Sequence, residues 1–117
     1  MTLAYAWQMN PRERPLPPPP PGHGFLWYGA HDALSARAKQ QLRGIVHRLI
    51  EAHALPPGFV EFIVERTVVP HELHVHADLI TRGPRQLVFA HGAFPATGLT
   101  DYDARELVIA LGGKLDT

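Results

Sequence analysis

The stretch from His71 to Leu79, HELHVHADL, brings three histidines and two carboxylates into nine residues. Imidazole and carboxylate side chains exchange protons near neutral pH, and both bind zinc and iron ions. Acid–base or metal-assisted hydrolysis is therefore the chemistry that these residue types favour. The candidate catalytic residues are His76, His74 and Asp78, with His76 at the centre of the group.

A β-strand must position these histidines, because apolar and polar residues alternate along the stretch. The same period of two recurs before and after it, and Gly83 and Pro84 in the second link are typical of a tight turn. The pattern predicts three antiparallel strands. They lie within residues 59–69, 73–79 and 86–91.

The register of these strands follows from matching their apolar faces, because a slip of one residue would turn every apolar side chain to the wrong side. A four-residue loop at 69–72 places Val64 opposite Ala77 and Glu65 opposite His76. The turn at Gly83 and Pro84 then places His76 opposite His91.

This register predicts a row of possible metal ligands across the sheet. Two histidines and one carboxylate form the ligand set of zinc hydrolases and non-haem iron enzymes. Glu65, His76 and His91 are therefore candidate metal ligands, with zinc or iron as the cofactor.

A simpler interpretation is that the histidines lie on the solvent side of a sheet whose other side is covered by helices. Ile63 and Phe89 fall on the histidine side in the predicted register, together with Ile80 and Leu87. Apolar residues that are exposed together mark protein interfaces. Ile63 and Phe89 are therefore candidate interaction residues, and no cofactor is expected under this interpretation.

Two helices and a further strand complete the predicted domain. Apolar residues recur at helical spacing from Leu34 to Ile50, with Asp32 or Ser35 as the first cap, and Thr100 begins a second helix. The aromatic stretch Phe25–Ala30 is predicted to be a strand. The sequence thus predicts an α+β fold of order β-α-β-β-β-α, with two helices on one face of a three-stranded antiparallel sheet.

An extended proline-rich arm precedes this domain, since residues 11–22 are PRERPLPPPPPG. A proline run lacks amide donors and adopts polyproline II, which serves either as a stiff solvated spacer or as a docking segment. Aromatic residues before the run favour docking. We therefore expect an arm at 1–22 and a single α+β domain at 23–117. The candidate contacts of the arm are Tyr5, Trp7, Pro17, Pro18 and Pro19.

Composition limits the partners and the compartment. The chain has 117 residues, eleven Lys plus Arg against eleven Asp plus Glu, and no cysteine. Zero net charge does not favour nucleic acid, and the lack of cysteine excludes disulfides and thiolate metal sites. No apolar run approaches the ~20 residues of a membrane span, and the amino terminus is unlike a signal peptide. We expect a cytoplasmic or virion-associated protein that is neither secreted nor membrane-bound.

Local resemblances to known families bear on function. Residues 74–80, HVHADLI, resemble the histidine-triad motif of nucleotide hydrolases and transferases, which implies that His76 attacks phosphorus, although Asp78 replaces the third histidine. The order of helix, three strands and helix is similar to double-stranded-RNA-binding domains. The last helix here begins TDYD, however, instead of with the lysines that grip phosphates. Similar layouts of helices and sheet occur in phage tail-terminator proteins, but a shared layout does not establish a shared function.

Two hypotheses for function follow. The first is a non-enzymatic interaction or assembly subunit, an adaptor or structural component of a larger complex such as a phage or virion particle. It would dock on other protein subunits through the arm and the exposed sheet face, or on further copies of itself. The alternative is a small histidine-dependent enzyme centred on His76, either metal-dependent or a histidine-triad-like phosphoester or nucleotide hydrolase.

Overall fold

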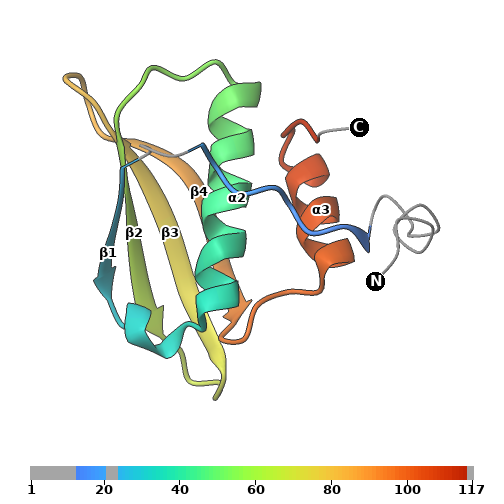
Figure 1. Ribbon diagram of the computed structural model, residues 1–117. Helices are drawn as coiled ribbons and strands as arrows, with labels where there is room; N and C mark the ends of the chain where they lie inside the picture. Colours follow the sequence, from blue (N-terminus) through green and yellow to red (C-terminus); the bar gives the residue numbers. More distant parts are fainter. Residues whose placement is uncertain (1–12, 21–23, 116–117) are drawn as a thin grey trace.

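The computed structural model describes residues 13–20 and 24–115, and it shows a mixed α+β fold in which two helices cover one face of a four-stranded sheet (Figure 1). The predicted α+β class and the order β-α-β-β-β-α are confirmed. Tyr5 and Trp7 lie outside the described residues. The elements are β1 (Phe25–Gly29), the 3-10 helix η2 (His31–Ala33), α2 (Ala36–Ala52), β2 (Phe59–Arg66), β3 (Glu72–Ile80), β4 (Gln86–Pro95) and α3 (Asp101–Ala110).

The sheet contains four strands, so the predicted sheet of three strands is wrong. β1 pairs in parallel with β2, and the strand order is β1-β2-β3-β4. A hairpin cannot join two parallel strands, and α2 supplies the crossover between them. The ring of Trp27 stacks on that of its register partner Phe62, with 4.2 Å between the ring centroids. This contact fastens β1 to the core.

Alternation along β2 and β3 buries the apolar side chains of one face, except that Val68, which the same alternation predicts to be buried, follows the end of β2 and is 99% exposed. The register of the two strands differs from the predicted one by two residues. Val64 lies opposite Val75 instead of Ala77. The loop explains the difference: β2 ends at Arg66, and the Thr67 hydroxyl accepts a hydrogen bond from the Val69 N–H at 3.1 Å. A shift of two residues leaves every side chain on its face. The buried residues are Val60, Phe62, Val64, Leu73, Val75, Ala77 and Leu79.

An irregularity in β4 overturns the predicted positions of Phe89 and His91. Val88 is an extra residue that has no partner in β3, which makes a β-bulge. Beyond the bulge, Phe89 and His91 turn to the side that the helices cover, where Phe89 is buried. The prediction that Phe89 is an exposed interaction residue is therefore wrong. His91 lies opposite Val75 and not opposite His76.

Both helices begin at a side-chain cap. Ser35 caps α2, and its Oγ accepts a hydrogen bond from the Ala38 N–H at 3.0 Å; Asp32, the other predicted cap, lies in η2. Thr100 caps α3 by accepting a hydrogen bond from the Asp103 N–H at 3.1 Å.

Within the described ranges, neither helix has the length and apolar character that a membrane span requires.

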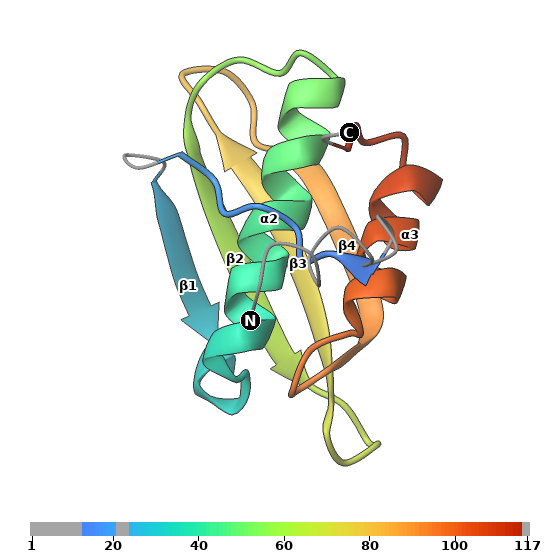
Figure 2. The ribbon, with the colours of Figure 1, turned by 45° about the vertical axis from the view of Figure 1, so that its right-hand side comes forward.

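Polar contacts from α2 fix the loop that leads to α3. The buried side chain of Gln41 donates from Nε2 to the Leu99 carbonyl at 2.6 Å and accepts from the Leu99 N–H at 2.8 Å. Arg37 donates to the same carbonyl at 2.7 Å and to Asp101 Oδ1 at 3.2 Å. These bonds hold α3 beside α2 in the helical layer (Figure 2). The core lies between the helices and the sheet. Its largest fully buried side chains include Phe62, Phe94, Leu42, Ile45, Leu49 and Leu79.

The described part of the proline-rich arm, residues 13–20, crosses α2 (Figures 1 and 2). At the crossing, a Cβ on Gly44 would lie 3.4 Å from the Leu16 Cβ and 3.5 Å from the Pro17 carbonyl oxygen. A side chain larger than a methyl group at position 44 would therefore displace the arm. Pro17 is half-buried and Pro18 is exposed. This part of the arm contacts its own domain, and contact of Pro17, Pro18 and Pro19 with a partner protein stays a prediction.

Candidate interaction surface

The face of the sheet opposite the helices carries four rows of side chains, which follow from the strand pairing. We call this set of residues the open sheet face. His74, His76, Asp78 and Ile63 lie on it, and Phe89 and His91 do not. From β1 to β4, the rows are Phe59 and Ile80; Leu26, Glu61, Asp78 and Leu87; Tyr28, Ile63, His76 and Ala90; and Glu65 with His74.

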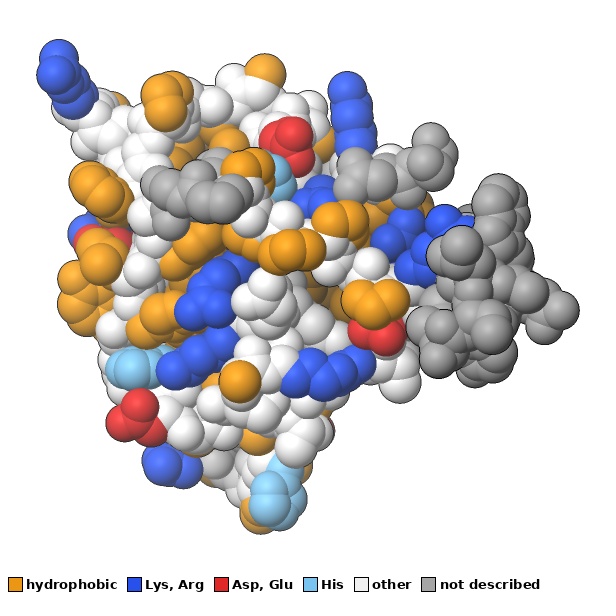
Figure 3. All heavy atoms as spheres, in the orientation of Figure 1, with side chains coloured by type: hydrophobic (Ala, Val, Ile, Leu, Met, Phe, Trp, Pro, Cys, Tyr) orange, Lys and Arg blue, Asp and Glu red, His pale blue; other side chains and the backbone are white. Residues whose placement is uncertain are grey.

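Large apolar side chains are the most exposed part of the open sheet face. Phe59 and Leu87 are each 60% exposed, Tyr28 is 47% exposed and Leu26 is 43% exposed. Leu26 and Tyr28 belong to the edge strand β1 and Leu87 to the edge strand β4, so the apolar residues flank the polar centre. In Figure 3, hydrophobic side chains gather along the left margin of the molecule, over β1 and β2. They form a patch and are not scattered singly.

An ion network of three residues occupies the centre of the open sheet face. Glu61 and Asp78 are register partners on β2 and β3, and their side chains are only 17% and 12% exposed. Arg85 donates from Nη1 to Glu61 Oε2 at 2.9 Å and to Asp78 Oδ2 at 3.3 Å. The hydrogen bonds to Glu61 and then to Asp78 raise the pKa of Arg85 above its ordinary value. One guanidinium therefore orients two carboxylates and leaves an excess of negative charge.

The histidines lie beside this network without forming the predicted metal site. His76 Nε2 is 4.0 Å from Asp78 Oδ2, which is beyond hydrogen-bond distance. Glu65 lies opposite His74 instead of His76, so the predicted row of Glu65, His76 and His91 is not formed. Among residues 13–20 and 24–115, no three histidine, aspartate or glutamate side chains are placed to hold a metal ion. The shift in register and the bulge in β4 together separate the predicted ligands.

His91 lies between two aromatic rings on the helix-covered side. Its ring centroid is 6.3 Å from that of Phe89 and 5.7 Å from that of Phe94. Its Nδ1 accepts a hydrogen bond from the Ala93 N–H at 3.3 Å, which requires this nitrogen to be unprotonated. Burial lowers the pKa of His91 below its ordinary value of 6.5. The fold therefore favours the neutral imidazole.

We expect the fold to lose stability as the pH falls below 6.5, in part because of His91. The unfolded chain takes up the proton at a higher pH than the folded chain does. The stabilisation from neutral His91 is therefore complete above pH 6.5 and is lost as the pH approaches the lower folded pKa. Urea unfolding between pH 8 and pH 5 should show a smaller loss for His91→Gln than for the wild type. The control is His74→Gln. If His91→Gln loses as much unfolding free energy between pH 8 and pH 5 as the wild type and the control do, this assignment is contradicted.

Three residues of this surface are not identified as such by the sequence alone. Leu26 and Tyr28 lie in a strand that the predicted three-stranded sheet does not include, although their alternation with Phe25 and Trp27 indicates that they share one face. Arg85 follows the Gly83–Pro84 turn, and only the register shows that it lies over two carboxylates. Comparison with protein-family models, curated proteins and solved structures gives no match to this chain.

Proposed function

We propose that this protein is a non-enzymatic interaction subunit that docks on a partner protein through the open sheet face. One observation carries the proposal: four large apolar side chains on this face are 43% to 60% exposed around a preorganised ion network. Interfaces combine apolar anchors with oriented polar groups in this way. An exposed apolar patch of this kind is otherwise a liability for a monomeric protein.

The charge on the open sheet face favours a basic partner. The face carries the carboxylates of Glu61, Glu65 and Asp78, and Arg85 reaches over two of them. A partner that presents lysine or arginine around apolar side chains would satisfy this excess of negative charge. Two copies of the same acidic face would repel each other. The proline-rich arm, with Tyr5 and Trp7 in its first part, is proposed as a second contact with the same partner.

The proposal is tested by capture of the partner on the immobilised full-length protein. The test variant carries Phe59→Glu and Leu87→Glu, which place charges at the two most exposed anchors of the face. The control carries Tyr102→Glu and Ile109→Glu, at exposed apolar residues that lie on α3. Loss of one interface anchor costs at least ~2 kcal/mol of binding at a hot spot, or about thirtyfold in affinity.

We expect a partner with a basic surface to be retained by the wild type and by the α3 variant and to be lost from the face variant. Measurement of the affinity with the purified partner then checks the expected loss. Equal binding by the face variant and the wild type would overturn the proposal. Sedimentation of the isolated protein should show a monomer. A dimer that the face variant abolishes and the α3 variant keeps would show that the open sheet face binds a second copy of the chain and not a basic partner.

A further inference from the structure

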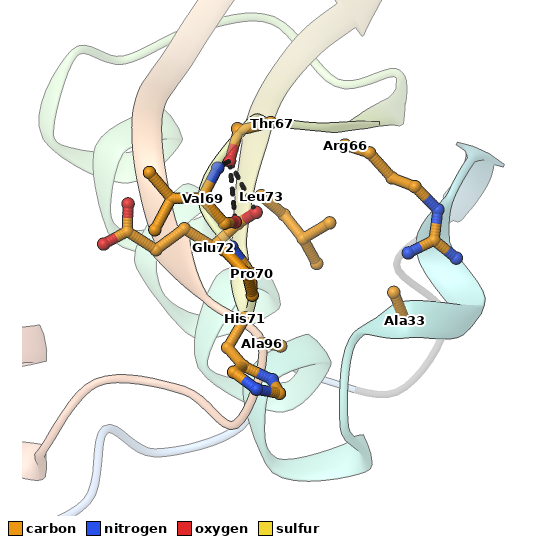
Figure 4. A pocket seen from close by; sticks show the side chains of 9 residues that line it. All are labelled: Ala33, Arg66, Thr67, Val69, Pro70, His71, Glu72, Leu73 and Ala96. Atoms are coloured by element: carbon orange, nitrogen blue, oxygen red, sulfur yellow. Dashed lines mark hydrogen bonds between the residues drawn. The ribbon is translucent and has the colours of Figure 1, made fainter.

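A pocket of about 170 Å³ lies at the β2–β3 hairpin, away from the open sheet face. Arg66 follows Val64 by two residues in β2, so it lies on the helix-covered side of the sheet. Leu73, Ala33 and Ala96 provide the apolar wall, and His71 lies across from Arg66 (Figure 4). We call this cavity the hairpin pocket. Its other lining residues are Thr67, Val69, Pro70 and Glu72.

The hairpin that shapes this pocket is rigidly fastened. The Thr67 hydroxyl accepts a hydrogen bond from the Val69 N–H at 3.1 Å and lies 3.0 Å from the Glu72 carbonyl oxygen. The Ala96 N–H donates to the His71 carbonyl at 2.8 Å, which ties the hairpin to the end of β4. His71 has a φ of 67°, a left-handed conformation that is uncommon outside glycine. The backbone of the hairpin at His71 is therefore held in place by these contacts.

The positive charge of the pocket is that of Arg66, an exposed residue. Among residues 13–20 and 24–115, no carboxylate forms an ion pair with Arg66. The one carboxylate that belongs to a lining residue is that of Glu72, which points to the opposite side of the hairpin from Arg66 (Figure 4). A guanidinium beside an apolar wall presents a planar set of donors that matches a carboxylate or phosphate group.

We infer that the hairpin pocket binds a small oxyanion, a carboxylate or phosphate group carried on a short apolar body. Arg66 would pair with the oxygens, and the apolar body would lie against Leu73, Ala33 and Ala96. His71 lines the other side of the pocket and limits the space for the ligand. The volume corresponds to roughly five or six waters at about 30 Å³ each, so the occupant is a side chain or small molecule.

The inference is tested by titrating the full-length protein with sodium butyrate and, separately, with sodium phosphate. The readout is the shift of the Leu73 and Ala96 amide signals in ¹⁵N–¹H NMR spectra. We expect saturable shifts that weaken by about tenfold or more in Arg66→Gln, because a charge-assisted hydrogen bond is lost. His71→Asn should weaken binding less, since asparagine also tolerates the left-handed backbone and keeps the hairpin folded. Arg82→Gln, at the exposed β3–β4 turn, is the control and should bind as the wild type does.

The outcomes separate the possible sources of the oxyanion. Saturation by butyrate alone identifies a carboxylate ligand, and saturation by phosphate alone identifies a phosphate ligand. Shifts that do not saturate, or that are the same in Arg66→Gln and the wild type, would overturn the inference. Since the pocket and the open sheet face lie on different sides of the sheet, Arg66→Gln should leave partner capture unchanged. The two proposals can therefore fail independently.

Discussion

Replacing Phe62 by alanine is expected to lower the free energy of unfolding by about 3–5 kcal/mol, the range for large aromatic residues truncated in a core. Phe62 has no exposed surface, and its ring stacks on Trp27 at 4.2 Å and on Phe25 at 5.8 Å between centroids. Truncation removes both ring contacts and leaves a cavity beneath α2. Urea unfolding followed by circular dichroism measures the loss. If the alanine variant fails to fold, Phe62→Leu, with a smaller volume change, should still show a clear loss.

Phe59→Ala is the matched control for this prediction. Phe59 is three residues earlier in β2 and points to the open sheet face, where it is 60% exposed. Substitutions at exposed positions away from special features change stability by about 0.5 kcal/mol or less. The same residue type in the same strand should therefore give two very different losses. Equal losses would show that both faces of the sheet are covered, which contradicts the assignment of an open face.

Gly29→Ala should also destabilise the fold strongly, because Gly29 lies where β1 meets β2. Its φ of 74° is in the left-handed region, which costs roughly 1–2 kcal/mol for a residue with a side chain. A Cβ at this position would also collide with the Val64 carbonyl oxygen. That carbonyl accepts the Ala30 N–H at 2.7 Å, so it cannot move without loss of a hydrogen bond. The total loss should exceed the backbone contribution alone.

The control for this substitution is Gly92→Ala in β4. A Cβ on Gly92 would meet no heavy atom within 4 Å, and Gly92 is not among the glycines with positive φ. Removing the flexibility of a strand glycine stabilises the fold by about 0.4–1 kcal/mol when the backbone is compatible. The melting temperature should therefore fall in Gly29→Ala and rise in Gly92→Ala, as measured by thermal unfolding. Similar melting temperatures would contradict the parallel pairing of β1 with β2 at Gly29.

Polarity alone predicts which side chains of β2 and β3 are buried, because the period of two survives any even shift of register. Val60, Val75 and Leu79, which are apolar residues of the alternating stretches, are buried. Alternation does not determine the register of the two strands, because a shift of two residues still places apolar residues opposite each other. In the observed register β2 ends at Arg66, and the Thr67 hydroxyl closes the loop that follows. The predicted row of metal ligands depends on the register, so that prediction is wrong. The prediction of which face of the strand a residue occupies depends only on alternation.

The bulge at Val88 is a second feature that alternation does not reveal. Leu87 lies on the open sheet face as predicted, but the extra residue reverses the alternation for Phe89 and His91. No turn or glycine signal accompanies Val88 in the sequence. By contrast, the fourth strand was within reach: a strand followed by a long helix and another strand is typically a parallel crossover unit. Applied to Phe25–Gly29, that rule predicts parallel pairing with β2, and the structure shows Tyr28 beside Ile63 in that pairing.

Hydroxyl-radical footprinting of the protein, alone and in its captured complex, tests most directly whether the open sheet face is the docking surface. In the free protein, Phe59, Leu87 and Tyr102 should all be oxidised, because each is exposed. In the complex, Phe59 and Leu87 should be protected while Tyr102, on α3, keeps its reactivity. A complex in which Tyr102 is protected and Phe59 remains reactive would place the partner on the helices and contradict the proposed docking surface.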